Sequence, residues 1–455
     1  MNKTRERIKN VLICVLLLGM VYLTYLVWFF DSPFGKVKFL DFFSDEEESY
    51  MIYEGTGSDA ENFGIRPVGV FIRDEAGSRG AIYESGASDI LYRALRDEVA
   101  EVMGKTSAPA VSSEKEWDLA LLSNGVMFDY SGNIPVEALR MWLGRAGDEE
   151  GICARFFMFS ASGKNITVYT KNTKNGEINK YTSNHSSREF MEKAEALTDA
   201  KTASLAVERE EKDFLAVAGE TIIMENRAKL PVISVVNAFD SFKTEITNAC
   251  LGTFKLRDST SGMYSEQDGT TVYIADMVTL KISPFGVAFY NDGREFADET
   301  LGIEVEYEGE SPTLAETVET ARKLATTLAS ALPGRGGIYI EDVLEDREKV
   351  EVVFGRTVNG VPVKMKNTSY FMRVQIADGM VKSARANLRC YESTSQTTDI
   401  FTERIAAAAI SGSGELGSLR LFYNDSGETQ NISPEWFVGQ ATYEEGRNED
   451  GMVKS

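Results

Sequence analysis

The sequence predicts an α+β fold in which an N-terminal transmembrane helix is followed by two or three small domains of curved antiparallel sheet packed on helices. Three features favour this fold: an uncharged run of twenty residues near the start, amphipathic helical stripes that alternate with groups of short β-rich runs, and hairpin-type turn pairs between those runs. The chain has 455 residues and is 43% hydrophobic, which allows roughly three domains with real cores.

The first thirty residues predict a retained membrane anchor. Val11 to Phe30 contains no charged residue, and as a helix it would be about 30 Å long, which matches the hydrocarbon thickness of a bilayer. A cleaved signal peptide would have a shorter apolar core and a small-x-small site after it, which Trp28 to Pro33 does not offer. Basic residues precede the run and acidic residues follow it: Lys3, Arg5, Arg7 and Lys9 before, and Asp31 and Asp45 to Glu48 after. The positive-inside bias therefore places residues 1–10 in the cytoplasm and the bulk of the chain outside.

Small and polar residues inside residues 11–30 are candidate contacts with another membrane helix. Gly19, Tyr22 and Thr24 would allow close approach and hydrogen bonding in lipid. A plain anchor without a partner explains this composition equally well. Cys14 lies inside the apolar run without the preceding small residue of a lipoprotein signal, so we expect no lipid attachment there.

Residues 31–207 are predicted to form an N-terminal extracytoplasmic α+β domain. Val68, Val70 and Ile72 alternate as in a strand, and the apolar residues from Ile90 to Val102 have helical spacing after a cap at Ser88 or Asp89. The remaining elements are an alternating run from Trp117 to Leu121, a strand over 125–130 with a turn at 131–133, a short helix from Pro135 to Leu143, a hairpin between Cys153 and Tyr181, and a polar helix near Ser187 to Leu197.

Two further α+β domains are predicted over residues 208–333 and 334–443, followed by a frayed tail over 444–455. The middle domain should contain a helix from Val236 to Cys250 closed by Gly252, a meander from Thr271 to Tyr290, and a helix that begins at Ser311-Pro312 with an apolar stripe from Leu314 to Leu332. The C-terminal domain should contain five strands between Ile338 and Leu388 with hairpin turns at Asn359-Gly360 and Asp378-Gly379, a helix over 402–410 and a strand over 418–423.

Composition excludes several classes of function. The formal net charge of −22 argues against nucleic-acid binding, because phosphates require a basic surface. The chain has one histidine and four widely spaced cysteines, so the His- and Cys-based zinc motifs are absent and no metal or cofactor is expected. The three cysteines beyond the anchor, Cys153, Cys250 and Cys390, are predicted to be buried small hydrophobic residues and not a disulfide framework.

Three short motifs suggest chemistry, but each has a stronger structural interpretation. Gly412 to Gly417 fits GxGxxG, yet a helix precedes it and a strand follows, the reverse of a dinucleotide-binding fold. Ser112 to Lys115 has SxxK spacing without the partner KTG motif, which favours a loop. His185 is predicted to be an exposed loop residue and not the base of a catalytic triad.

Carboxylate pairs are equally uninformative. Asp342 with Glu345, or Glu304 with Glu306, resembles an acid and base pair, but acidic residues are abundant throughout the chain. Asp45 to Glu48 lacks the ligand spacing and turn glycine of a calcium loop. The sequence therefore predicts a protein that is not an enzyme.

Two groups of segments resemble a known family. Leu251 to Phe254, Glu266 to Thr270 and Val287 to Tyr290 look like the core of the YycH family. Three further segments are similar to the module that YycH shares with YycI: Val350 to Phe354, Asn359 to Val363, and Val374 to Val381. The N-terminal anchor and the total length agree with this family.

The resemblance implies a function and partners. YycH proteins are membrane-tethered regulators of the WalK (YycG) sensor histidine kinase in Gram-positive bacteria. This chain would then be a single-pass membrane protein that partners a YycI-like protein and biases the kinase through transmembrane contacts. Two other classes stay open: a cell-envelope enzyme with an atypical carboxylate site, and a structural envelope or sporulation-associated protein without a kinase partner.

Overall fold

A computed structural model describes most of the chain beyond residue 63. The described residues are 64–146, 151–197, 200–226, 229–237, 239, 242–256, 262–294, 301–307, 309–334, 336–346, 349–365, 370–398, 400–411, 417–428 and 430–440. The chain divides into two compact units, Met1–Met51 and Ile52–Ser455, and all described residues belong to the second. The predicted anchor over 11–30, with Gly19, Tyr22 and Thr24, and the predicted tail over 444–455 lie outside the described residues. Within the described ranges, no helix is both long enough and apolar enough to cross a membrane.

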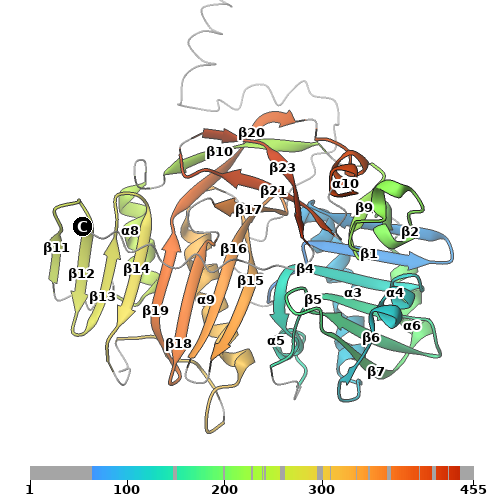
Figure 1. Ribbon diagram of the computed structural model, residues 1–455. Coiled ribbons are helices and arrows are strands. Elements are labelled where there is room, and N and C mark those ends of the chain that lie inside the picture. The colour runs from blue at the N-terminus through green and yellow to red at the C-terminus, as the bar shows by residue number, and fades with distance from the viewer. Residues whose placement is uncertain are drawn as a thin grey trace, which may run out of the picture. The chain divides into compact units, whose positions relative to one another are not determined.

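The predicted α+β class is confirmed, with seven α-helices and largely antiparallel sheets in the described part of the chain (Figure 1). The first sheet has nine strands in the order β3-β7-β6-β5-β4-β1-β2-β8-β9. Its strands are β1 (Gly69–Asp74), β2 (Gly77–Ile82), β3 (Ala110–Val111), β4 (Gly125–Pro135), β5 (Cys153–Ser160), β6 (Asn165–Lys171), β7 (Ile178–Ser186), β8 (Lys201–Leu205) and β9 (Ile222–Met224).

Four helices accompany this nine-stranded sheet. They are α3 (Ser85–Met103), α4 (Glu114–Leu121), α5 (Val136–Trp142) and α6 (Ser187–Glu195). Helices α3 and α6 pack against each other and against the strands, while α4 contacts β5. Leu91, Leu95, Val99 and Val102 of α3 are buried as their helical spacing predicts, whereas Ile90, the first residue of the predicted stripe, is 66% exposed.

The second sheet has eleven strands, ten of them in the order β11-β12-β13-β14-β19-β18-β16-β17-β21-β23, with β15 paired to β16. Its strands are β11 (Gly262–Ser265), β12 (Thr271–Ala275), β13 (Val278–Ile282), β14 (Val287–Asp292), β15 (Gly337–Asp346), β16 (Lys349–Val358), β17 (Val361–Met365), β18 (Met372–Ala377), β19 (Met380–Asn387), β21 (Gly417–Asp425) and β23 (Pro434–Gln440). All neighbouring strands are antiparallel except β17 and β21, which run parallel. Helices α8 (Lys243–Thr253) and α9 (Leu314–Ala331) pack against each other, and α9 covers β15, β16 and β18 (Figure 1).

The remaining elements form a short third sheet and a small satellite core. The third sheet is β20-β10-β22, with β10 (Leu230–Asn237), β20 (Arg389–Thr398) and β22 (Gln430–Ile432). The 3-10 helices η1 (Ala206–Glu208) and η2 (Lys212–Phe214) lie with α10 (Glu403–Ser411) around a separate apolar cluster. Nearly all other buried apolar residues belong to one continuous core.

Strands from different predicted domains share sheets. Strand β14, from the predicted middle domain, pairs with β19, from the predicted C-terminal domain, and β10 pairs with β20 in the same way. The predicted boundaries at residues 207, 333 and 443 stay predictions.

Several element predictions need correction. Trp117, Leu119 and Leu121 belong to a helix, α4, because Ser113 caps it and Trp117, Ala120 and Leu121 are buried with helical spacing. Helix α3 begins at Ser85, three residues before the predicted cap. The predicted turn at 131–133 is an irregularity inside the continuous strand β4.

Three further helix boundaries differ from the prediction. Helix α9 is capped by Thr313 and not by Ser311, because Thr313 and Glu316 form a reciprocal capping box. Helix α8 starts at Lys243, since Val236 continues β10, and it runs past Gly252 to Thr253.

The nine-stranded and eleven-stranded sheets meet closely at β4 and β15. A Cβ atom on Gly132 would lie 2.2 Å from the carbonyl oxygen of Ile340, so only glycine fits there. The indole Nε1 of Trp142 donates to Glu319 Oε2 at 2.8 Å, and the amide of Leu421 donates to the Tyr83 hydroxyl at 3.1 Å. These contacts define the junction between the two sheets.

Candidate functional site

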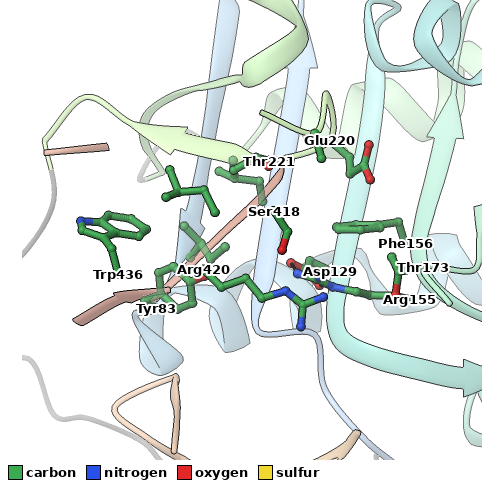
Figure 2. Close-up of a pocket in the computed structure, with 14 residues that line it drawn as sticks. Tyr83, Asp129, Arg155, Phe156, Thr173, Glu220, Thr221, Ser418, Arg420 and Trp436 are labelled. Carbon is green, nitrogen blue, oxygen red and sulfur yellow. Dashed lines mark hydrogen bonds and ion pairs between the residues drawn. The ribbon is translucent and has the colours of Figure 1, made fainter. Parts of the chain in front are cut away.

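A small cavity lies at this junction, between β4 and β5 on one side and β21 and β23 on the other. It has a volume of about 50 Å³, and its charged or aromatic lining comprises Tyr83, Asp129, Arg155, Phe156, Glu220, Arg420 and Trp436 (Figure 2). A single water needs about 10–15 Å³ of such volume, so the cavity holds a few waters. We take the charged groups around it as the candidate site.

The centre of the site is a buried ion pair between adjacent strands. Arg155 of β5 donates from Nε to Asp129 Oδ1 and from Nη2 to Oδ2, each at 2.7 Å, in a two-pronged arrangement. Both side chains are buried, and the guanidinium carbon lies 4.4 Å from the centroid of the Phe156 ring. Burial opposes the charge of Arg155, but the charge and hydrogen bonds of Asp129 outweigh it, so the pKa of Arg155 rises.

The local backbone of β4 positions Asp129. The pairing of β4 with β5 shifts register between Asp129 and Ile134, and Ser131 within this irregular stretch has a φ of 69°. Asp129 Oδ1 accepts a hydrogen bond from the Ser131 amide at 2.8 Å, which holds this uncommon backbone conformation. The Asp129 carboxylate therefore accepts three hydrogen bonds.

A second carboxylate forms the far wall of the cavity. Glu220 is buried, and its Oε2 accepts from Trp117 Nε1 at 3.4 Å and from Lys171 Nζ at 3.3 Å. Lys171 also pairs with Glu114 at 2.7 Å. Burial works against the charge of Lys171, yet Glu220 and Glu114 together raise its pKa above the usual value.

Strand β21 contributes the third wall. Arg420 Nη1 donates to the carbonyl oxygen of Ser131 at 3.3 Å, and Figure 2 shows its side chain extending toward Asp129 and Arg155. Arg420 thus links β21 to the irregular stretch of β4. Each carboxylate of the cluster is held by a cation, Asp129 by Arg155 and Glu220 by Lys171, and Arg420 joins the cluster to the eleven-stranded sheet.

The residues singled out in the sequence lie elsewhere. Ser112 donates to Glu116 Oε2 at 2.6 Å, and Lys115 lies in α4, so the SxxK residues belong to a helix start. The GxGxxG loop falls outside the described residues over 412–416, but α10 precedes it and β21 follows it, as predicted. Asp342 pairs with Lys174, and Glu304 bridges to Met380.

His185 was predicted wrongly as an exposed loop residue. It lies in β7, is only 6% exposed, and its Nε2 lies 3.2 Å from Glu98 Oε2 of α3. The prediction failed because α3, which covers this histidine, lies more than eighty residues earlier in the chain.

The prediction of buried, unpaired cysteines is confirmed for Cys250 and Cys390, whereas Cys153 is unpaired but less buried than predicted. Cys153, Cys250 and Cys390 are free thiols; the latter two are buried and Cys153 is half-buried. Within the ranges that the structure covers, no group of three or more His, Cys, Asp or Glu side chains is arranged to hold a metal ion.

Sequence reasoning missed the Asp129–Arg155 pair, although a signal was present. Each of the two is a charged residue inside an otherwise apolar, aromatic-rich strand, Phe128-Asp129-Tyr130 and Ala154-Arg155-Phe156. Two opposite charges in neighbouring buried strands indicate a pair.

Comparison with known proteins gives one finding. No family model matches the sequence, and no curated protein matches it. Among solved structures, the fold is similar to that of YycH from Bacillus subtilis, with a TM-score of 0.48 and 12% sequence identity over 84% of this chain and 95% of that one. That structure bears the name of the family which the segments between Leu251 and Val381 resemble.

Proposed function

We propose that this protein is a single-pass, membrane-anchored extracytoplasmic regulator that modulates a two-component sensor histidine kinase through protein-protein contacts, together with a YycI-like partner. The observation that carries the proposal is the uncharged run from Val11 to Phe30 between a basic and an acidic segment. The family resemblance of the segments between Leu251 and Val381 supplies the kinase and the partner.

Charge supports the proposed orientation. The first ten residues carry +3 of the chain's formal −22, so the part from residue 31 onward carries −25. Positive charge is retained on the cytoplasmic side, which favours a cytoplasmic N-terminus and an extracytoplasmic bulk.

The proposed mechanism is a shift in the populations of two kinase states. Membrane-helix contacts that differ between the two states bias the kinase by at most the difference in their free energies. A difference of about 1.4 kcal/mol would change the ratio of the states tenfold. We propose Gly19, Tyr22 and Thr24 as the contact residues, because small and hydrogen-bonding side chains associate helices in lipid.

The decisive experiment replaces residues 11–30 with an unrelated spanning helix of equal length. Kinase output, measured as phosphorylated response regulator in cells, should then resemble that of a strain lacking the protein. A finer comparison uses Gly19→Ile against the control Leu18→Ile on the neighbouring helix face: only the first should alter output. Wild-type output from the replaced anchor, at equal protein level, would remove the transmembrane mechanism.

Partner identity needs a separate test. Affinity capture of the full chain from solubilised membranes should recover a histidine kinase and a YycI-like protein. Capture of neither, from membranes shown to contain both, would contradict the proposed partnership.

A further inference from the structure

A second, larger cavity lies on another part of the junction. It has a volume of about 160 Å³ and is bounded by Gly64 to Val68, the first turn of α3, one side of α9, and the turn between β16 and β17. For comparison, a cavity of about 150 Å³ accommodates a molecule the size of benzene. This cavity therefore has room for a small organic molecule, unlike the one beside Asp129.

Helix α9 presents a polar ladder to this cavity. Arg322, Thr326 and Ser330 are spaced four residues apart, so they share one helix face, and all three line the cavity. The apolar stripe of the same helix is buried in the core. Arg322 is buried, Thr326 is half-buried and Ser330 is exposed, so the row runs from the interior of the cavity to its mouth.

The threonines of α9 show which hydroxyl is available. Thr317, Thr320 and Thr327 each donate to the carbonyl oxygen four residues earlier, at 2.8, 3.1 and 2.8 Å. The hydroxyl of Thr326, which lines the cavity, makes no such bond and no other side-chain hydrogen bond within the described part of the chain.

Thr357 supplies a second available hydroxyl from the opposite wall. It lies in β16 and is only 6% exposed, yet within the described ranges its hydroxyl makes no hydrogen bond. The hydroxyl oxygen of Thr357 is not completely enclosed by protein atoms. Because Thr357 lines the cavity, the small exposed part of this residue faces the cavity. A hydroxyl that is buried in the fold but open to a cavity is suited to a ligand.

Two guanidinium groups line the cavity, each paired with a carboxylate. Arg322 is 2% exposed and is oriented by Glu319, whose two oxygens it meets at 2.6 and 2.7 Å. Arg66 is 14% exposed and pairs with Asp89. The N-terminus of α3 also reaches this cavity at Ser85, and Glu84, the residue before it, is paired with Lys201.

We propose that this cavity binds a small oxyanion, a carboxylate or phosphate group on a molecule of roughly benzene size, through Arg66, Arg322, Thr326 and Thr357. Arginine pairs with planar and tetrahedral oxyanions, and hydroxyl donors complete the coordination of their oxygens. Asp89 is the only carboxylate among the lining residues, and it is already engaged by Arg66. The bound anion would connect α3, α9 and β16.

The test measures binding directly on the full chain purified in detergent. Isothermal titration with inorganic phosphate, and separately with malonate, should show one site for at least one of the two at constant ionic strength. Binding of phosphate alone, or of malonate alone, identifies which oxyanion the site prefers. Absence of binding for both at tens of millimolar would overturn the proposal.

Variants then place the site. Thr326→Val and Thr357→Val each remove one hydroxyl with little change in shape, and each should weaken binding about tenfold, the usual effect of losing a hydrogen bond to a charged group. The matched control is Thr327→Val, which removes the neighbouring hydroxyl that bonds to the Lys323 carbonyl outside the cavity. Equal affinities of Thr326→Val and Thr327→Val would contradict the assignment.

Stability is monitored so that the result can be interpreted. Thr326 is only half-buried, so Thr326→Val alone decides the test if Thr357→Val fails to fold. Because the titration requires no kinase, its result is independent of the proposed regulatory function.

Discussion

The Asp129–Arg155 pair shows how a single buried charge depends on its partner. The carboxylate accepts three hydrogen bonds, two of them from Arg155, and both side chains are removed from water. Asp129→Asn would keep the shape but leave the guanidinium without a counter-charge. We expect a loss of about 3–5 kcal/mol in the free energy of unfolding, measured by urea denaturation.

Two comparisons make this prediction specific. The double variant Asp129→Leu with Arg155→Met removes both charges and should recover much of the loss. Arg188→Met breaks the exposed pair of Arg188 with Glu192, whose side chains are 87% and 58% exposed, and should leave stability unchanged. A variant Asp129→Asn as stable as the parent protein would show that the pair is not structural.

The buried thiols predict how stability depends on alkaline pH. Burial raises the pKa of Cys250 to about 12 and that of Cys390 to about 11. In the unfolded chain these thiols ionise near their usual pKa of about 8.5, while the native protein retains their protons. The stabilisation is therefore complete below that value and is lost as pH rises toward the native pKa.

Each such thiol should lower the free energy of unfolding by about 1.4 kcal/mol per pH unit above pH 9. Urea denaturation at pH 8, 9 and 10 measures this slope. The slope should become shallower in Cys250→Ala, which removes one of these groups. Equal slopes for the parent and the variant would mean that Cys250 ionises equally in both states.

At the scale of the element, the N-terminal cap of helix α9 is Thr313, whereas the sequence suggested Ser311. Thr313 Oγ1 accepts from the Glu316 amide at 3.2 Å, and Glu316 Oε2 accepts from the Thr313 amide at 2.8 Å. Thr313→Ala should cost about 1 kcal/mol in the free energy of unfolding. Ser311→Ala, at the predicted cap, should cost nothing; the reverse order in thermal or urea unfolding would restore the original prediction.

Elements set by local rules were predictable from the sequence. The hairpin turns at Asn359-Gly360 and Asp378-Gly379 have positive φ at all four residues, which is the conformation that these pairs favour. Helix α4 was missed because Trp117, Leu119 and Leu121 also fit a two-residue period. The decisive fact, that Leu119 is 60% exposed, depends on what lies beside the helix.

The candidate site was not predictable for a related reason. Asp129 and Arg155 meet only through the register of β4 against β5, which an irregularity displaces. Glu220 and Arg420 reach the same cavity from segments hundreds of residues apart along the chain. The spacing of residues in the sequence does not reveal such long-range contacts. Charged residues inside apolar strands do indicate which strands contain a buried ion pair.

At the scale of the whole molecule, the junction predicts that the two large sheets unfold together. They are joined at Gly132, Trp142 and Tyr83, within a single compact unit. Hydrogen exchange followed by mass spectrometry should therefore show β5 and β18 losing protection at the same urea concentration.

A glycine variant tests this coupling. Gly132→Ala would force β4 away from β15, and β5 and β18 should then lose protection at different urea concentrations. Gly163→Ala is the control, because a Cβ there would come no nearer than 3.7 Å to its closest neighbour. Separate transitions already in the parent protein would instead favour independent domains divided near residue 207.

The order of strands also constrains how the protein can be made. Strand β10 pairs with β20, and β17 pairs with β21, so both strands wait for partners among the last seventy residues. During synthesis from the N-terminal end both strands would be unpaired, and these edges are open to aggregation until the chain is nearly complete. Truncation shortly before residue 417 would therefore lower the yield of folded protein far more than its small loss of mass suggests.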